Sequence, residues 1–166
     1  MRHLALTVTI AGLAAGLVAC SKPQPAAPVS GAQAGASPTG DEPGDADSKA
    51  LLARLPAPYN TADLDNGAAK FALCASCHTA REGAPAMTGP NLHGLFGSKA
   101  GSVAGFKYSD DMKAANWTWD AARMDAWITD PKAVLPNTKM TFIGLKDPKD
   151  RADIIAYLMI ETGFKP

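Results

Sequence analysis

The chain has 166 residues and a formal net charge of zero at neutral pH, counting histidine as neutral. A chain of this length is expected to form one domain rather than two of ordinary size. Since nucleic-acid binding depends largely on an excess of basic residues, a balanced charge argues against that class of function, and we expect no nucleic-acid partner.

The first segment has the features of an export signal. Residues 1–3 form a short basic segment, and residues 4–18 form an unbroken run of apolar and small residues. This run is too short for a transmembrane helix and suits a signal-peptide core. It ends in Leu-Val-Ala-Cys at 17–20, which resembles a bacterial lipobox. We therefore expect a signal peptide over residues 1–19 and a lipid on Cys20; the alternatives are an ordinary secretory signal and an uncleaved anchor.

The next segment reads as a linker. From Ser21 to about Ala50 the chain is rich in Pro, Ala, Gly and Ser, carries an acidic patch and shows no apolar periodicity. Such a composition is typical of disorder, because too little apolar surface can be buried to offset the entropy of ordering. We expect residues 20–58 to be the lipidated N-terminus and a disordered linker, and residues 59–166 to be the folded domain.

Apolar periodicity and capping residues predict three helices in this domain. The first covers roughly residues 62–74. The second begins after Thr118 as N-cap and ends before Pro131. The third has Asp147 as its N-cap and Gly163 just past its end. The apolar faces of the second and third helices consist of Ala121, Met124, Trp127 and Ile128, and of Ile154, Ile155, Leu158 and Met159.

Between residues 80 and 115 the chain has many Gly and Pro residues and no convincing strand pattern. The sequence therefore predicts an all-α fold with long loops. The apolar core of such a small domain is too limited by itself, and we expect it to fold around a large apolar group.

Cys74-Ala75-Ser76-Cys77-His78 indicates what that group is. Two cysteines three residues apart lie on one helical face, so both sulfurs can reach the vinyl groups of one porphyrin. The adjacent imidazole can then bind the iron. This spacing is typical of covalent haem attachment.

Two other functions can be weighed for these residues. A thioredoxin-like thiol pair would need a preceding strand and a βαβ pattern, which the sequence lacks. A zinc site would need four ligands. Cys74, Cys77 and His93 could contribute to one, but His78 would then have no role.

A second axial ligand is expected from one of the six methionines. Met140 lies about sixty residues after His78, in a loop between the second and third helices, where the chain can cross the other face of a haem. Met87 and Met112 are not excluded by spacing alone. The two methionines on the apolar helix faces are assigned to the core.

Several stretches between about residue 65 and residue 164 match the sequence pattern of a known family. They are residues 74–78, 88–97, 105–109, 119, 136–145 and 151–158. In these stretches the chain resembles the class I cytochromes c of the mitochondrial type and their close bacterial relatives. The resemblance implies a small all-α fold in which helices and loops wrap around one covalent haem c.

The resemblance also implies a role for each matched residue at the iron. Cys74 and Cys77 would form the haem thioethers, and His78 and Met140 would be the axial ligands. Pro90 would accept a hydrogen bond from the second ring nitrogen of the histidine, which orients the imidazole and raises its basicity.

Other matched residues would surround the haem. Tyr108 and Trp119 would donate hydrogen bonds to a propionate, and Phe142 would lie near the exposed haem edge. Trp127 stands where the mitochondrial proteins usually have tyrosine beside the methionine sulfur, and its indole can donate but not accept a hydrogen bond. Two further departures are Ser98 in place of a frequent arginine, and Asn137 in place of a usual glycine.

The sequence thus predicts a monohaem electron carrier rather than an enzyme, since two axial ligands leave the iron no open position. The resemblance implies a monomer that takes electrons from a quinol:cytochrome c reductase and gives them to a terminal oxidase. Its expected location is the periplasmic side of a bacterial membrane, held by a lipid; an uncleaved N-terminal helix or a soluble periplasmic form are the alternatives. A peroxidase, a ligand-binding sensor or a fixed dehydrogenase subunit remain alternative functions.

Overall fold

The computed structural model describes residues 44–165, so the predicted signal peptide, Cys20 and most of the predicted linker lie outside the described residues. Within this range no segment forms a β-strand; a single isolated bridge pairs Lys99 with Thr118. The all-α expectation is confirmed. The helices are α1 (Asp45–Leu52), α2 (Leu64–Ala75), α3 (Asp110–Ala114), α4 (Ala121–Thr129), α5 (Pro131–Val134) and α6 (Pro148–Glu161), with a 3-10 turn at Tyr59–Thr61.

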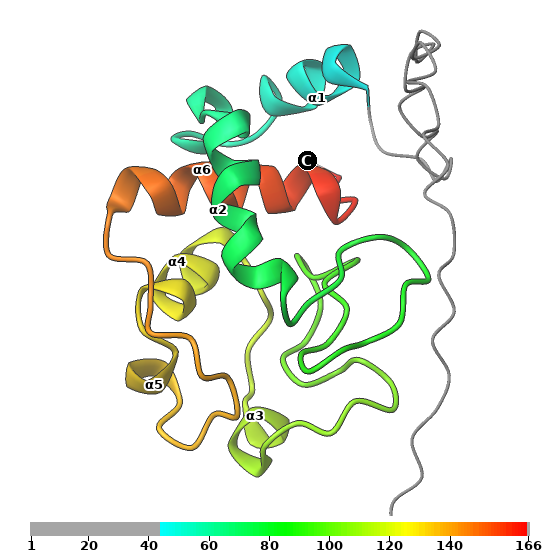
Figure 1. Cartoon of the computed structure of the whole chain (residues 1–166), viewed down its shortest axis with the longest axis vertical. Helices are drawn as coiled ribbons and strands as arrows, with labels where there is room; N and C mark the ends of the chain where they lie inside the picture. Colours follow the sequence, from blue (N-terminus) through cyan, green and yellow to red (C-terminus); the bar gives the residue numbers. More distant parts are fainter. Residues whose placement is uncertain (1–43, 166) are drawn as a thin grey trace, which may run out of the picture. The chain divides into compact units, whose positions relative to one another are not determined.

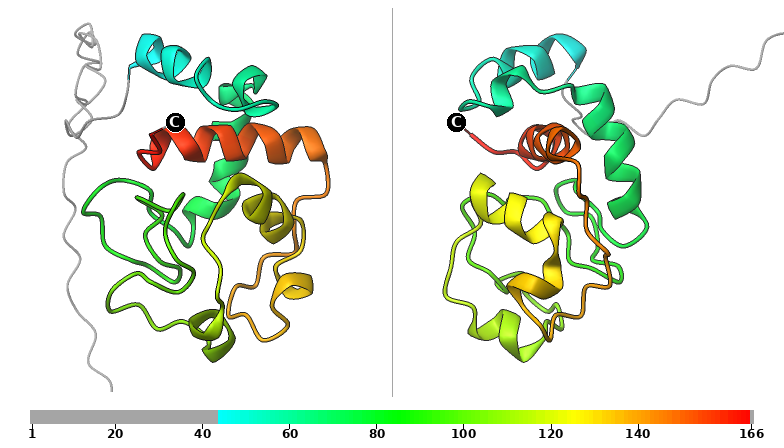
Figure 2. Two further views of the ribbon diagram at one scale, coloured as in Figure 1. Left: turned by 180° about the vertical axis from the view of Figure 1, so that it is seen from behind. Right: turned by 90° about the vertical axis from the view of Figure 1, so that its left-hand side faces the viewer.

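The main contact between helices is the crossing of α2 over α6, which Figures 1 and 2 show from three sides. Gly67 lies at the crossing. A Cβ atom added there would overlap the carbonyl oxygen of Asp153 and would lie 2.7 Å from Cβ of Tyr157. Only glycine therefore allows the two helices to approach this closely. The rings of Phe71 and Tyr157 meet beside the crossing, with centroids 5.6 Å apart.

The three predicted helices are present, and one predicted cap is wrong. The α6 prediction is confirmed: the Asp147 carboxylate accepts hydrogen bonds from the amides of Lys149 and Asp150 at 2.8 and 3.0 Å. The cap of α4 is Asp120 instead of Thr118, and it accepts a bond from the Arg123 amide at 2.7 Å. A carboxylate satisfies an exposed helix amide at least as well as a hydroxyl.

The two shortest helices were not predicted. The α3 helix is capped by the Ser109 hydroxyl and α5 by the Asp130 carboxylate. With five and four residues, neither helix is long enough to show an apolar period.

The expected domain start at residue 59 needs correction, because ordered structure begins earlier. The α1 helix contacts α6 and the 3-10 turn. Leu55, which follows α1, is only 5 % exposed and belongs to the apolar core. Residues 44–58 thus form an ordered N-terminal extension of the domain. Disorder is expected there from composition because the average over the whole segment is dominated by polar and small residues and does not reveal the few leucines.

Replacing Leu55 with alanine is therefore expected to destabilise the domain by about 2–5 kcal/mol, the usual range for a buried leucine. Chemical unfolding of the haem-loaded protein measures this change. The matched control is Arg54→Ala, because Arg54 is the exposed neighbour of Leu55. Equal and small effects of both substitutions would show that the extension does not stabilise the domain.

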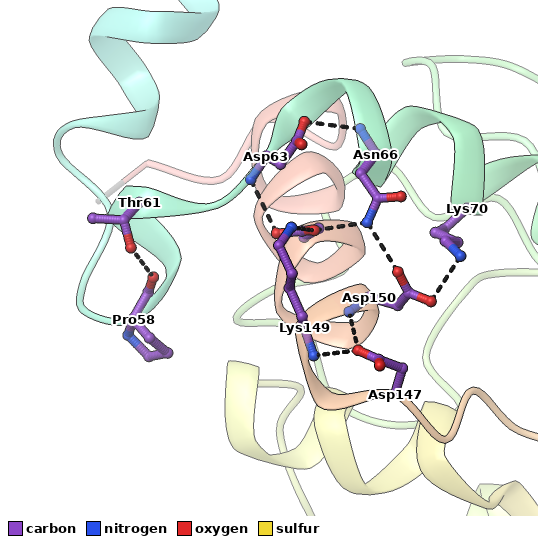
Figure 3. Close-up of polar contacts among 9 residues, drawn as sticks. Pro58, Thr61, Asp63, Asn66, Lys70, Asp147, Lys149 and Asp150 are labelled. Atoms are coloured by element: carbon purple, nitrogen blue, oxygen red, sulfur yellow. Dashed lines mark hydrogen bonds and ion pairs between the residues drawn. The ribbon is translucent and has the colours of Figure 1, made fainter.

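A polar cluster ties the start of α2 to the start of α6 (Figure 3). Asp153 is 2 % exposed and accepts hydrogen bonds from Lys149 Nζ at 2.6 Å, Asn66 Nδ2 at 2.7 Å and the Asp63 amide at 3.0 Å. Asp150 accepts a second bond from Asn66, at 3.0 Å, and an ion pair joins Lys70 to Asp150 at 2.7 Å. The cluster thus gives the buried Asp153 carboxylate three hydrogen-bond donors at this helix junction.

These hydrogen bonds make the stability of the folded domain depend on pH. Burial raises the pKa of Asp153, but the hydrogen bonds from Lys149, Asn66 and the Asp63 amide outweigh it, so the net pKa is below the ordinary aspartate value. A carboxyl whose pKa is depressed in the folded state stabilises it above the unfolded pKa, and that stabilisation is lost as the pH falls through the folded pKa.

Asp153→Asn is accordingly expected to lower the free energy of unfolding by about 1–3 kcal/mol at pH 7. The difference from the wild type should shrink as the pH falls from about 4, the ordinary aspartate pKa of the unfolded chain, through the lower pKa of the folded wild-type carboxyl. Urea unfolding between pH 7 and pH 2.5 measures both quantities. Asp65→Asn, an exposed carboxylate in the first turn of α2, is the control. A gap between Asp153→Asn and wild type that stayed constant with pH would contradict this account.

Candidate functional site

A cavity of about 650 Å³ lies among the end of α2, the loop that follows it, α3, α4 and the segment before α6. Its walls are mostly apolar, and no Asp or Glu side chain of residues 44–165 lines it. Every site residue predicted within the described part of the chain lines this cavity. These residues are Cys74, Cys77, His78, Pro90, Tyr108, Trp119, Trp127, Met140 and Phe142.

The end of α2 and the turn that follows it present the two cysteines. Cys74 lies in the last turn of the helix, and its carbonyl accepts hydrogen bonds from the amides of both Cys77 and His78 at 2.9 Å. This turn brings the three side chains to one wall of the cavity. The two cysteines are not joined by a disulfide. Burial, with a smaller effect of the nearby Cys77, raises the pKa of Cys74 to about 11, so its thiol is protonated at neutral pH.

The histidine is fixed in orientation by the loop that follows. Nδ1 of His78 donates to the carbonyl oxygen of Pro90 at 2.8 Å, as predicted. Burial lowers the pKa of His78, and the bond to Pro90 opposes this only in part, so the imidazole is neutral at pH 7. With its hydrogen on Nδ1, the ring has a lone pair on Nε2, which is the atom a metal ion would use.

Gly89 supports the same ring from one side. A Cβ atom at this position would lie 2.6 Å from Nδ1 and 2.7 Å from Nε2 of His78, too close for any side chain. The Gly89 amide also donates to the Cys77 carbonyl at 2.8 Å, which holds the loop against the cysteine turn. The backbone of Gly89 is therefore packed directly against the imidazole of His78.

The methionines differ in how they reach the cavity. Met140 lines it from a loop and is half-buried, and its amide donates to the Thr138 hydroxyl at 3.2 Å. Met87 is 50 % exposed and is not part of the lining. Met112 and Met124 reach the cavity from buried positions on α3 and α4, where they belong to the apolar core.

Aromatic side chains form much of the remaining wall. Trp119 packs edge-to-face on Trp127, with ring centroids 5.6 Å apart, and both indoles are almost fully buried. Tyr108 packs against Phe106 at 4.7 Å. Burial raises the pKa of Tyr108, although a hydrogen bond with the Val103 backbone partly opposes this, so its hydroxyl stays protonated at neutral pH and can donate.

The two alternative functions for the cysteine motif find no support in this geometry. No strand precedes the motif within residues 44–165, as a thioredoxin-like site would need. The described side chains also contain no group of three or more His, Cys, Asp or Glu placed to hold a metal ion. His93 lies instead at the cavity wall, against Gly163.

Three features of the site were not predicted. They are the contact of Gly89 with the imidazole, the bonds of Lys139 to the segment opposite, and the bond of Asn137 to α3. Each depends on which distant segment faces the residue, and no local spacing encodes that.

The residues fit a covalently held haem. Two thiols, a neutral imidazole and a thioether line one apolar cavity together with aromatic hydrogen-bond donors. Its volume lies within the range of about 300–1,000 Å³ typical of cofactor pockets.

No helix in residues 44–165 is long and apolar enough to cross a bilayer.

Comparison with known proteins agrees with this chemistry. Residues 64–160 match the family model described as cytochrome c. The chain is 49 % identical to cytochrome c2 of Rhodoplanes tepidamans over 96 residues, which is 58 % of this chain and 90 % of the relative. It is 47 % identical to cytochrome c2 of Rhodomicrobium vannielii over 105 residues, 63 % of this chain and 84 % of the relative.

A eukaryotic relative is nearly as similar. Cytochrome c of Kluyveromyces lactis is 42 % identical over 106 residues, which is 63 % of this chain and 96 % of the relative. The family match begins at the first residue of α2, so α1 and the 3-10 turn precede it. With its fold, its cavity and this match in agreement, the chain belongs to the cytochrome c family, whose members are electron carriers, not enzymes, with one covalent haem c.

Proposed function

We propose that this chain carries single electrons from a quinol:cytochrome c reductase to a terminal oxidase, as a monomer held at the periplasmic side of a bacterial membrane by a lipid on Cys20. The observation that carries the proposal is the convergence of Cys74, Cys77, His78 and Met140 on one apolar cavity. The bound haem supplies a one-electron Fe(III)/Fe(II) couple.

The side chains would divide the work as follows. Cys74 and Cys77 would hold the haem through thioethers, and His78 Nε2 and the Met140 sulfur would ligate its iron. His/Met ligation and apolar burial favour a high reduction potential. The Pro90 carbonyl keeps the imidazole in the orientation and tautomer that ligation requires.

The aromatic residues act at the haem periphery. Tyr108 and Trp119 would donate hydrogen bonds to a propionate, and Trp127, which lines the same cavity, would lie near the methionine sulfur. Phe142, which is half-buried in the cavity wall, would lie near the haem edge through which electrons leave. Filling both axial positions excludes oxygen or peroxide from the iron, which separates this function from that of a peroxidase or a sensor.

The charge pattern supports docking that is less dependent on salt than in strongly basic relatives. From Tyr59 onward the chain has 12 basic and 12 acidic residues. Leu73 and Met87, near the cysteine motif, are exposed apolar residues. Lys132, Lys139 and Lys146 are exposed between the start of α5 and the start of α6, and Lys146 Nζ lies 3.9 Å from Asp130 Oδ2. Electrostatic steering accelerates association by roughly 10- to 1000-fold and collapses with ionic strength, so a smaller patch gives a shallower dependence.

The test is oxidation of the reduced holoprotein by oxidase-containing membranes from its own source, from low to high ionic strength. We expect turnover with a shallow decline. Failure of the membranes to oxidise the protein, or copurification with a dehydrogenase in fixed stoichiometry, would contradict the shuttle. Carbon monoxide binding to the reduced wild type at neutral pH would instead favour a sensor.

The lipid anchor is tested separately. Mass spectrometry of the mature protein from its membranes should find a lipid on Cys20, and Cys20→Ser should be neither lipidated nor processed to that N-terminus. An unlipidated wild type recovered from the soluble periplasmic fraction would disprove the anchor without affecting the electron-transfer proposal.

A further inference from the structure

The loop that carries Met140 has little internal support. Residues 135–147, between α5 and α6, contain neither helix nor strand. Before the methionine, the internal bonds of the loop are those from the Thr138 amide to the Leu135 carbonyl at 3.0 Å and from the Met140 amide to the Thr138 hydroxyl at 3.2 Å. Contacts with other segments must therefore hold Met140 in place.

Two residues just before Met140 reach across to the segment that leads into α3. Lys139 Nζ donates to the carbonyl oxygens of Lys107 at 2.9 Å and Tyr108 at 3.1 Å. Asn137 Nδ2 donates to Asp111 Oδ2 at 2.9 Å, and Asp111 lies in the first turn of α3. The methionine loop is thus bonded to a segment that itself lines the cavity through Tyr108.

Both segments contribute residues to a surface hollow of about 700 Å³. The residues around it are Phe106, Lys107, Tyr108, Ser109, Asp110, Asp111, Lys113, Asn137 and Lys139. Dispersion attraction needs close packing, which a hollow does not provide. The polar bonds of Asn137 and Lys139 are direct links between the two segments beside this hollow.

We propose that Asn137 and Asp111 form a latch that holds the methionine loop against α3, and that both are positioning residues for the Met140 sulfur. The proposal rests on the proposed role of Met140 as distal ligand. The latch is an amide-to-carboxylate bond, and hydrogen bonds to ionised acceptors are stronger than neutral ones. Opening it shifts the population toward conformations in which the sulfur leaves the iron and an external ligand can bind.

The experiment measures imidazole binding to the ferric full-length holoprotein at fixed pH. The weak near-infrared band of sulfur-ligated ferric haem reports displacement of the methionine. Asn137→Ala and Asp111→Ala should each tighten the apparent affinity for imidazole about three- to tenfold, the effect of losing one partly exposed hydrogen bond. Asn137→Asp, which faces Asp111 with a like charge, should tighten it further.

A charge swap separates the latch from a general loss of structure. The double variant N137D/D111N exchanges donor and acceptor, so it should return imidazole affinity toward the wild-type value. The matched control is Asp110→Ala. Asp110 is the fully exposed neighbour of Asp111 in the same turn, and it pairs with Lys113 at 3.1 Å. This control should leave imidazole binding unchanged.

The outcomes distinguish the latch from the ligand assignment. If Asn137→Asp binds imidazole as weakly as wild type, or if the swap fails to restore that affinity, the latch is refuted. Loss of the near-infrared band in Met140→Ala with no change in the latch variants would also refute the latch while leaving the proposed function intact. A band that survives Met140→Ala would overturn the assignment of Met140 itself.

Discussion

Replacing Met140 with alanine is expected to abolish the near-infrared band of the ferric protein and to let carbon monoxide bind the ferrous protein. Alanine offers no sulfur, so one axial position opens. The reduction potential should fall by a sizeable part of the roughly 0.8 V range that axial ligands span. Absorption spectra in both oxidation states and a potentiometric titration measure all three changes.

The other methionines near the haem motif supply the controls. Met112→Ala removes a side chain that is 6 % exposed, so it should destabilise the domain by about 2–5 kcal/mol but retain the band. Met87→Ala, at a half-exposed site outside the cavity, should change neither property appreciably. If Met112→Ala removes the band and Met140→Ala retains it, the ligand assignment is wrong.

Gly89→Ala is expected to have the second large effect, because the added methyl group must displace the His78 ring. The ring would move away from the Pro90 carbonyl and lose the 2.8 Å bond that fixes its tautomer. Overpacking typically costs about 1–3 kcal/mol, and more where neither neighbour can yield. We expect a thermal midpoint lower by roughly 10 °C or more, together with a reduced yield of haem-loaded protein.

Gly83→Ala is the matched control in the same loop. Gly83 has a φ of 69°, and nothing lies within 4 Å of a Cβ atom built there. Its substitution therefore costs only the left-handed backbone strain of alanine, about 1–2 kcal/mol, and leaves the histidine untouched. Equal effects of the two substitutions on the haem spectrum would show that contact with His78 is not what Gly89 provides.

The long helices were predictable from sequence because their signals are local. Ile154, Ile155, Leu158 and Met159 repeat at helical spacing, and all four are buried in α6. The cap of α4 was misplaced by two residues because Thr118 and Asp120 are both good capping residues. Backbone pairing decided between them, since Thr118 takes part in the bridge with Lys99.

The extension before residue 59 could not be predicted by the same means. Leu55 is buried because α6 offers a surface for the extension, and that surface exists only after residues about a hundred positions apart have come together. Composition describes the segment alone and therefore indicated a linker.

At the site, the attachment motif was predictable and its supports were not. Cys74, Cys77 and His78 are adjacent in sequence, so their chemistry follows from spacing. The partners of Asn137 and Lys139 lie 26 and 32 positions away in the chain, and only the folded loops bring them together.

The contact of α1 with α6 also shortens the linker that would join an anchored domain to its lipid. With the proposed lipid on Cys20, residues 21–44 would separate the anchor from α1, which begins at Asp45. A chain of 24 residues spans at most about 80 Å when fully extended. A linker that extended to residue 58 would be about half as long again as one that ends at residue 44.

Effective concentration falls roughly as the −3/2 power of linker length, so the shorter linker would raise the concentration of an anchored domain near a membrane-bound partner about twofold. No residue of 44–72 lines the cavity. If the domain is anchored as proposed, α1 would therefore bring it closer to membrane-bound partners without contributing to the site where electrons would be exchanged.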